Sequence, residues 1–428
     1  MTPLNWFTVQ HEKKWEILGH QKRFAFWVLY SSIGSMMLGF DWGISGTATA
    51  MPAFQQQMGI PWPDSESGYL IPARIQSGWA GALSAGEVVG VLLAGYVLNL
   101  VGRKHSIALS AMIAVVGISM QVASKEWKLF LVGRLVNSLG FSIAYIQSPV
   151  WIGENSRPEL RGFFLCITNT SIVLGQLIQS VVTRGVETID GKWSYQTLVV
   201  LQYLYCALLL VGYPFFPESP YYLLHKGKPE NARQALIRVH GLGDEDLINA
   251  EIERLQTAID VNVSLDAAQK EGGFLIVQCF RGKNLKRTLI AVMPAAAQHL
   301  IGGAFVFSYI TYFLGLLKIQ ENFTVSVVLY VVMLLSTISA FGLIEVVGRR
   351  PLLVWGMAFL AFVQITKGLS FDEMDHLFAE NVSPRHFQGA VKSHRDRIIY
   401  GEEAKDEIQS TAAKQSDSTT NKSVPGKL

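Results

Sequence analysis

The sequence has little charge and few cysteines. Of its 428 residues, 16% are Asp, Glu, Lys or Arg, half are hydrophobic, and the mean hydropathy is +0.28. This composition is too apolar for a soluble protein and is typical of a chain with several membrane spans joined by polar loops. The formal net charge of +3 is small and gives no sign of a nucleic-acid-binding protein.

Cysteine is too rare to organise the fold. The three positions, Cys166, Cys206 and Cys279, have neither the spacing of metal ligands nor that of a disulfide framework. No Ser-His-Asp order, phosphate-binding glycine loop or metal-ligand cluster occurs, and His299 is the only one of nine histidines well inside an apolar stretch. The sequence therefore predicts no enzyme, no cofactor and no metal site.

Long apolar stretches dominate the rest of the chain. A helix needs about 20 residues to cross a bilayer, and only helices or closed barrels satisfy the backbone in lipid. The predicted fold class is therefore an all-α membrane bundle with about nine spans. They are expected at residues 24–50, 78–100, 107–123, 129–151, 163–182, 198–216, 288–316, 325–347 and 352–365.

Basic residues gather in alternate loops, which marks those loops as cytoplasmic. Lys22 and Arg23 precede the first span, Arg103 and Lys104 follow the second, and Arg349 follows the eighth. One long polar stretch interrupts the spans, and its apolar residues recur at helical spacing. We predict a cytoplasmic N-terminus (1–23), a six-helix half (24–216), a cytoplasmic linker with short amphipathic helices (217–287), an incomplete three-helix half (288–365) and a polar, largely disordered tail (366–428).

The two halves contain a related motif. GYVLNLVGRKHSI at residues 95–107 follows the second span, and GLIEVVGRRPLL at residues 342–353 follows the eighth. Each has an apolar helix end, then glycine, arginine and a basic residue. Equivalent places in two six-span units indicate a parallel repeat, as in one large class of transporters.

Several motifs occur in a recognisable order. They are GFDWGISGTATAMPAF in the first span, AGEVVGVLLAG and VGRK at the second, VGRLVNSLGFS and GENSRPELRG at the fourth, PESPYYLL after the sixth and AAAQHLIGGAFVFSYITYFL in the seventh. The chain resembles the sugar porters of the major facilitator superfamily, especially the fungal alpha-glucoside (maltose-type) proton symporters. The resemblance implies a monomeric plasma-membrane transporter that carries an alpha-glucoside or hexose with protons by alternating access.

Asp41 is the acidic residue of the first span. A carboxylate in hydrocarbon costs about 2.5–3.5 kcal/mol on insertion scales, so a chain keeps one only with a partner or a use. At 1.5 Å per residue, Asp41 of span one and Arg134 of span four reach the same depth, and an ion pair would offset the burial. The alternatives are that Asp41 lies among the headgroups, or that Arg134 snorkels to them.

The resemblance gives this pair a role. It implies that Asp41 and Arg134 are the proton-coupling residues, and that Glu87 in span two is a further coupling acid. Glu87 has the alternative of a neutral helix–helix hydrogen bond. Maltose-type relatives usually carry a glutamate three residues before the span-one aspartate, whereas this chain has Leu38, so its coupling is expected to be simpler or less tight.

Sugar hydroxyl groups call for amide side chains at mid-membrane, on glycine-rich helices. Gln298 and His299 in span seven, and Asn169 in span five, stand where the resemblance implies substrate-binding residues. The family has adjacent glutamines at the first two positions and often a glutamine at the third, so substrate preference does not follow from the motif. The alternative for Gln298 and Asn169 is ordinary packing between helices.

The loops that contain VGRK, GENSRPELRG and VGRR, called the signature loops here, suggest a cytoplasmic gate. The resemblance implies that their Arg and Glu residues pair between the halves in the outward-open state, while Asn99 replaces the usual aspartate and should weaken this lock. The alternative is that the charges only orient the chain in the membrane. The expected gate residues are Gly102, Arg103, Glu154, Arg161, Glu345, Gly348 and Arg349.

The end of the ninth stretch departs from the family. A segment similar to TKGLSFDEMDHLF follows span twelve in the family, but in this chain it follows span nine. We expect spans ten to twelve to be absent, with a join near residues 362–366, either in a real isoform or through a faulty gene model. Two alternative functions stay open: transport of another hydroxylated molecule such as a fungal metabolite, and a non-transporting sensor or truncated product.

Overall fold

The computed structural model divides the chain into two units. One contains residues 1–291 and 302–346, and the other contains residues 292–301 and 347–428. Most of the second unit, and most of the predicted seventh span with Gln298 and His299, lie outside the described residues. The structure describes residues 18–19, 21–63, 68–157, 160–189, 191–241, 245–270, 285–286, 288–290, 292–293, 296, 322–348, 350–356 and 358.

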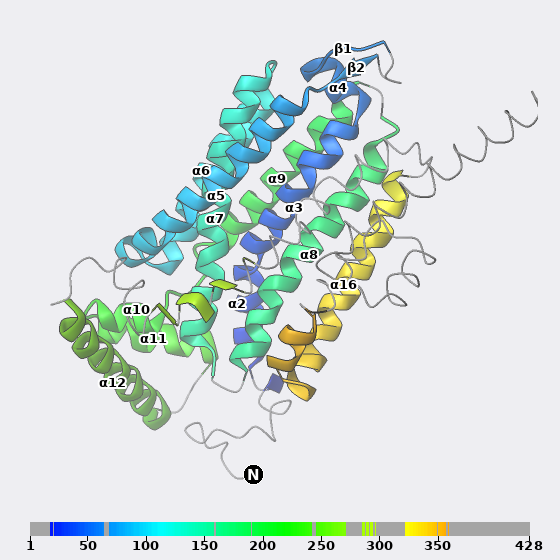
Figure 1. Cartoon of the computed structure of the whole chain (residues 1–428). Helices are drawn as coiled ribbons and strands as arrows, with labels where there is room; N and C mark the ends of the chain where they lie inside the picture. The colour runs from blue at the N-terminus through cyan, green and yellow to red at the C-terminus, as the bar shows by residue number, and fades with distance from the viewer. Residues whose placement is uncertain are drawn as a thin grey trace, which may run out of the picture. The chain divides into compact units, whose positions relative to one another are not determined.

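Long helices make up the first unit (Figure 1). The first predicted span is formed by α2 (Lys22–Ser31) and α3 (Ile33–Ala50), which meet at Ser32, whose hydroxyl group donates to the carbonyl of Val28. Six described helices are long and apolar enough to cross a membrane, and they cover the predicted spans two to six and eight. They are α5 (Ala73–Val101), α6 (Arg103–Ala123), α7 (Trp127–Asn155), α8 (Arg161–Val186), α9 (Trp193–Gly212) and α16 (Asn322–Val346).

Small residues bring α3 and α8 into backbone contact. A Cβ atom on Gly39 would lie 2.0 Å from the carbonyl oxygen of Ile172, and one on Gly175 would lie 2.0 Å from that of Met36. Close approach through small residues is the usual way in which membrane helices pack, because lipid supplies no hydrophobic force between them. Helix α16 packs along α8, where the rings of Phe163 and Phe341 lie 5.5 Å apart.

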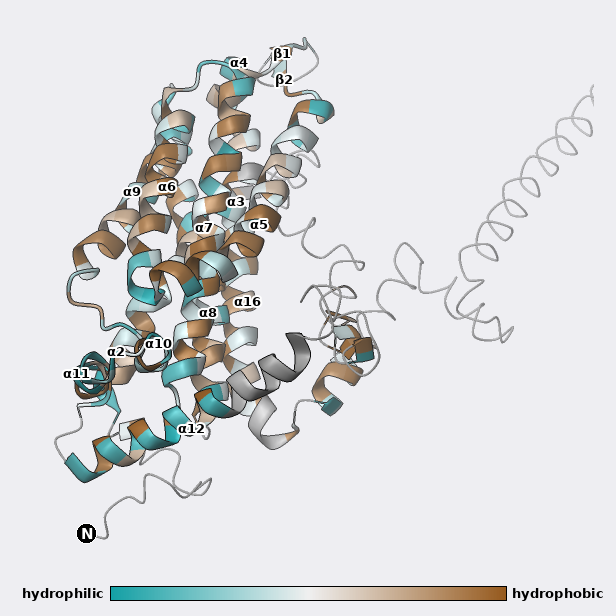
Figure 2. Ribbon diagram, turned by 90° about the vertical axis from the view of Figure 1, so that its left-hand side faces the viewer, coloured by the Kyte–Doolittle hydropathy of each residue, from teal (hydrophilic) through white to brown (hydrophobic). Residues whose placement is uncertain are grey.

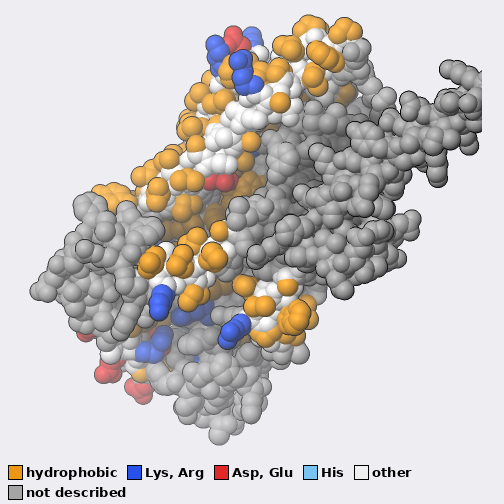
Figure 3. All heavy atoms as spheres, in the orientation of Figure 1, with side chains coloured by type: hydrophobic (Ala, Val, Ile, Leu, Met, Phe, Trp, Pro, Cys, Tyr) orange, Lys and Arg blue, Asp and Glu red, His pale blue; other side chains and the backbone are white. Residues whose placement is uncertain are grey.

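Apolar side chains cover the flanks of the helices. Helix α5 exposes Val88, Leu92 and Tyr96, as a lipid-facing helix does. Figure 2 shows brown, hydrophobic ribbon along the long helices and teal, hydrophilic ribbon on α11 and α12. In Figure 3, orange side chains cover the middle of the visible face, and Lys and Arg side chains lie toward its ends.

Short elements lie at both ends of the long helices. At one end, called the ribbon end here, α4 (Pro52–Met58) is followed by β1 (Ile60–Pro61) and β2 (Tyr69–Leu70). The strands pair antiparallel, with Ile60 opposite Leu70. This two-residue ribbon is a small departure from the predicted all-α chain. Helix α4 ends at Gly59, directly before β1.

The opposite end, called the linker end, carries α10 (Pro220–His225), α11 (Pro229–His240) and α12 (Glu245–Lys270) (Figure 1). Pro229 occupies the first turn of α11, and Gly241 ends it in the left-handed conformation, with φ of +71°. Helix α12 has 26 residues and is longer than the short helices predicted for this segment. No glycine or proline lies between Glu245 and Lys270 to end it sooner.

The sequence repeat has a backbone counterpart. Gly102 and Gly348, at equivalent places in the two signature motifs, have φ of +97° and +85°. Residues other than glycine rarely adopt these values. Each motif therefore places its glycine in the same special conformation directly after a long apolar helix.

Candidate functional site

Asp41 and Arg134 form an ion pair inside the helices. Nη1 of Arg134 on α7 lies 2.8 Å from Oδ1 of Asp41 on α3, and each side chain is only 1% exposed. The structure thus brings together the two residues that were expected to share one depth. Both side chains are buried among the helices, so Arg134 does not extend outward as a snorkelling side chain would.

Two amide side chains lie next to the ion pair. Asn137 follows Arg134 by three residues, so both side chains lie on one face of α7. Nδ2 of Asn137 donates to Oδ1 of Asp41 at 3.3 Å and to Oε1 of Gln202 on α9 at 2.9 Å. Asn137 and Gln202 are fully buried. The sequence prediction missed both, although an amide one turn from a buried arginine was a usable signal.

Glu87 lies beside this site. Nε1 of Trp42, the neighbour of Asp41 in the chain, donates to Oε1 of Glu87 on α5 at 2.5 Å. Glu87 is half-buried and close enough to interact electrostatically with both Asp41 and Arg134. The hydrogen bond joins two helices, and an oxygen of either the ionised or the neutral acid can accept it.

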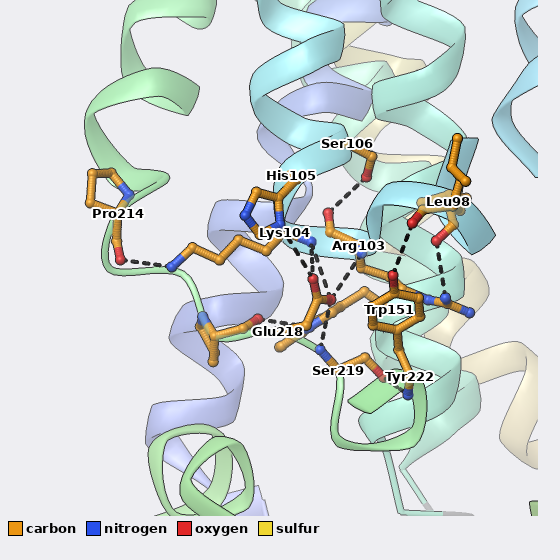
Figure 4. A network of polar contacts seen from close by, with 12 residues as sticks. Leu98, Arg103, Lys104, His105, Ser106, Trp151, Pro214, Glu218, Ser219 and Tyr222 are labelled. Carbon is orange, nitrogen blue, oxygen red and sulfur yellow. Dashed lines mark hydrogen bonds and ion pairs between the residues drawn. The ribbon is translucent and has the colours of Figure 1, made fainter. Parts of the chain in front are cut away.

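A second polar cluster lies at the linker end (Figure 4). The carboxylate of Glu218 points at the first turn of α6. Its Oε1 accepts from the backbone N–H of Arg103 at 2.9 Å and of Ser219 at 2.9 Å, and both oxygens accept from the N–H of Lys104, at 3.2 and 3.1 Å. A carboxylate at a helix N-terminus satisfies N–H groups that have no partner in the helix. Glu218 therefore ties the segment after α9 to α6.

Gly102 makes this contact possible. Its φ of +97° suits glycine, and a Cβ atom there would lie 2.4 Å from Oε2 of Glu218 and 2.9 Å from the ring of Tyr222. Tyr222 in turn donates to the carbonyl of Leu100 at 3.2 Å, and the Arg103 guanidinium lies 5.0 Å from its ring centroid. Glu218 and Tyr222 were not predicted as site residues, although the PESPYYLL motif contains both.

The expected gate residues are only partly assembled. The side chain of Arg103 forms an ion pair with Glu154 of α7, which belongs to the same half, whereas the resemblance implied pairing between halves. This pairing follows from position, because Arg103 begins α6 and Glu154 lies near the end of the adjacent α7. Arg161 is exposed on α8. The side chain of Glu345, and Arg349, lie outside what the structure describes.

Helix α11 packs against α2 through His240. The imidazole stacks on Phe24 of α2, with ring centroids 5.4 Å apart and an interplanar angle of 28°. Burial, helped by the positive charges of Arg157 and Arg254, lowers the pKa of His240 from 6.5 to about 4. The histidine is therefore neutral at pH 7, as the packing requires.

The predicted substrate-binding residues are not brought together. Asn169 is exposed on α8, and Gln298 and His299 lie outside the described residues. Helix α8 has two buried glutamines that the prediction missed, Gln176 and Gln179. Nε2 of Gln179 donates to Thr47 of α3 at 2.7 Å and to Thr183 at 2.9 Å. Among the described residues, no cluster of His, Cys, Asp or Glu is placed to hold a metal ion.

Comparison with known proteins gives consistent matches. The family model described as "Sugar (and other) transporter" matches residues 27–376. The chain is 28% identical to the high glucose sensor RGT2 of Saccharomyces cerevisiae, over 79% of this chain and 44% of the sensor. It is 26% identical to the general alpha-glucoside permease of that yeast, over 81% of this chain and 56% of the permease. It is also 26% identical to the major facilitator-type transporter ecdD of Aspergillus rugulosus, over 78% of this chain and 61% of that protein.

The chain spans about half the length of these curated relatives. Among solved structures, it is similar to the proton:xylose symporter XylE bound to 6-bromo-6-deoxy-D-glucose, with a TM-score of 0.63 and 21% identity. The match covers 77% of this chain and 70% of that one. At this identity the likeness concerns the fold.

Proposed function

Because the chain belongs to the sugar (and other) transporter family, we propose that it carries an alpha-glucoside or hexose with protons, by alternating access. The family and the XylE-like fold confirm the predicted major facilitator superfamily bundle and its likeness to sugar porters, and place the chain among multi-pass membrane proteins. We place the transporter in the plasma membrane. Its partners are the sugar, protons and the bilayer, and it acts as a monomer.

The observation that carries this proposal is the buried ion pair of Asp41 and Arg134. Each ion loses several kcal/mol of solvation on burial, and well-packed apolar residues in place of such a pair are often neutral or stabilising. Stability therefore gives little reason to keep the pair. Proton exchange gives a reason to keep the ion pair. Protonation of Asp41 removes its charge and releases Arg134, so the α3–α7 contact differs between the two protonation states.

The other residues have supporting roles. Glu87, linked to the neighbourhood of Asp41 through Trp42, serves as the second acid. Arg103, Glu154 and the signature-loop residues act as the gate at the linker end, which is the cytoplasmic side. Asn169, Gln298 and His299 contact the sugar.

Sugar-dependent proton uptake tests the proposal. The full chain in lipid vesicles should acidify the vesicle interior when sugar is added outside, and Asp41→Asn should abolish this because the amide takes up no proton. Asp260→Asn, which removes an exposed carboxylate on α12, is the matched control and should behave like the wild type. Sugar uptake with no pH change would refute proton coupling.

A sugar sensor is the second candidate function. It is favoured by the 28% identity to the high glucose sensor RGT2. A sensor would bind sugar, as measured by quenching of tryptophan fluorescence, without saturable uptake. Uptake of labelled sugar would exclude it. Absence of both binding and uptake across a panel of sugars would favour transport of another hydroxylated compound.

A further inference from the structure

The hydrogen bonds of Asp41 are unevenly divided between its two oxygens. Oδ1 accepts from Nη1 of Arg134 at 2.8 Å and from Nδ2 of Asn137 at 3.3 Å. Oδ2 is buried and makes no hydrogen bond of ordinary geometry among the described residues, although the side chain of Gln202 also acts on this carboxylate. In a protonated carboxyl group one oxygen carries the hydrogen and the other remains an acceptor. The arrangement leaves Oδ2 as the oxygen that takes the proton.

The bond from Asn137 suits both protonation states. Oδ1 accepts it as part of the carboxylate and also as the carbonyl oxygen of the neutral acid. The bond from Arg134 depends more on charge, because a guanidinium binds a carboxylate much more strongly than a neutral carbonyl. When a proton reaches Oδ2, the attraction that holds Arg134 weakens while the contact with Asn137 persists.

Gln202 fixes the orientation of the Asn137 amide. Nδ2 of Asn137 has two hydrogens, and its two acceptors, Oδ1 of Asp41 and Oε1 of Gln202, take one each. Turning the amide over would place its carbonyl oxygen against both acceptors, so the two bonds support one orientation. Asn137 is also tightly enclosed, because a Cβ atom on Gly117 of α6 would lie 2.4 Å from its backbone nitrogen.

We propose that Asn137, braced by Gln202, is a positioning residue that holds the Asp41 carboxyl group in place through the proton cycle. The proposal rests on the proposed function, in which Asp41 takes up a proton. The proton comes from water on one side of the membrane, binds Oδ2 and leaves to water on the other side. Among the described residues, the charged groups that act on Asp41 are Arg134 of α7 and Glu87 of α5.

Infrared difference spectroscopy of the full chain in lipid vesicles tests this without a transport assay. The carbonyl stretch of protonated Asp41 is assigned as the band lost in Asp41→Asn. A hydrogen bond to the carbonyl oxygen lowers its frequency, so Asn137→Leu should move the band to higher frequency. It should also raise the pH midpoint of the band by about one unit, because the anion loses a charge-assisted hydrogen bond.

Two further variants keep the test decisive. Gln202→Met removes the brace together with the Gln202 side chain's own interaction with Asp41. It should move the band in the same direction, and it decides the question if Asn137→Leu does not fold. Gln147→Leu removes another buried amide of α7, which accepts from Ser31 instead, and should leave the band unchanged. An unchanged band in Asn137→Leu, or in Gln202→Met where that variant has to decide, would overturn the positioning role.

Transport separates this inference from the function on which it rests. In proton-driven uptake, the pH midpoint should shift in Asn137→Leu as the infrared band does. A shifted band together with proton-independent uptake by the wild type would support the positioning of Asp41 and refute proton coupling.

Discussion

Asp41 and Glu218 are both largely buried carboxylates, but their donors differ. Asp41 accepts from two side chains, Arg134 and Asn137, both on one oxygen. Glu218 accepts from three backbone N–H groups and uses both oxygens. Backbone donors at a helix N-terminus stay in place as long as the helix exists, whereas side-chain donors change rotamer or move with a neighbouring helix.

The type of donor therefore distinguishes a carboxylate that keeps its charge, Glu218, from one that can exchange a proton, Asp41. Glu218 is well compensated by donors that cannot leave, so it joins α6 to the segment after α9. The charge of Asp41 is compensated by one side chain, Arg134, so the loss of that single partner changes its charge balance.

Removing Arg134 should have the largest effect. Arg134→Leu leaves an uncompensated buried carboxylate and should lower the free energy of unfolding by about 3–5 kcal/mol. The double variant Asp41→Leu/Arg134→Leu removes both charges and should recover most of that loss without recovering proton uptake. Thermal unfolding of the protein in detergent measures both. Equal stability of the single and double variants would mean that Asp41 is not compensated by Arg134.

His240 extends the comparison to a buried base. Its pKa is lowered to about 4, so the unfolded chain, with a pKa near 6.5, binds the proton first as the pH falls. Stability should be complete above pH 6.5 and should decrease down to about pH 4, by at most about 3 kcal/mol. His240→Phe keeps the stacking on Phe24 and should remove this pH dependence. Hydrogen exchange of α11 measures it, and His225→Phe, at an exposed histidine, should leave the pH dependence intact.

Neutralising Glu218 should have a smaller effect than breaking the interior pair. Glu218→Gln keeps one acceptor oxygen for the N–H groups of Arg103 and Ser219, but it loses the charge and the second acceptor, so we expect a loss of about 1–2 kcal/mol. The pH dependence of uptake should not change. Glu253→Gln, at an exposed position of α12, is the control for thermal unfolding. A pH profile altered as strongly as in Asp41→Asn would erase the contrast between the two carboxylates.

The smallest effect is expected for an exposed ion pair. Arg233 and Glu245 lie 2.9 Å apart, and the Glu245 side chain is 81% exposed. Water screens such a pair, so Glu245→Gln should change the free energy of unfolding by less than about 1 kcal/mol. A loss as large as that of Glu218→Gln would show that exposure does not set the strength of these contacts.

Hydropathy and residue counting were enough to locate most of the described helices. Apolar length predicted spans two to six and eight, and the rise per residue placed Asp41 and Arg134 at one depth. Proline and glycine marked the two ends of α11. Helix length, helix ends and depth along a helix are set by residues close to one another in the sequence, so they can be predicted from it.

Contacts between helices needed the tertiary structure. Asn137 and Gln202 lie 65 residues apart, and Arg103 and Glu154 lie 51 apart. Periodicity tells which residues share a face of one helix, but it does not tell how that helix is rotated against its neighbours. The partners of Asp41 and the donors of Glu218 follow from that rotation. Small residues help to set it, as where Gly117 of α6 packs against the backbone of Asn137 on α7.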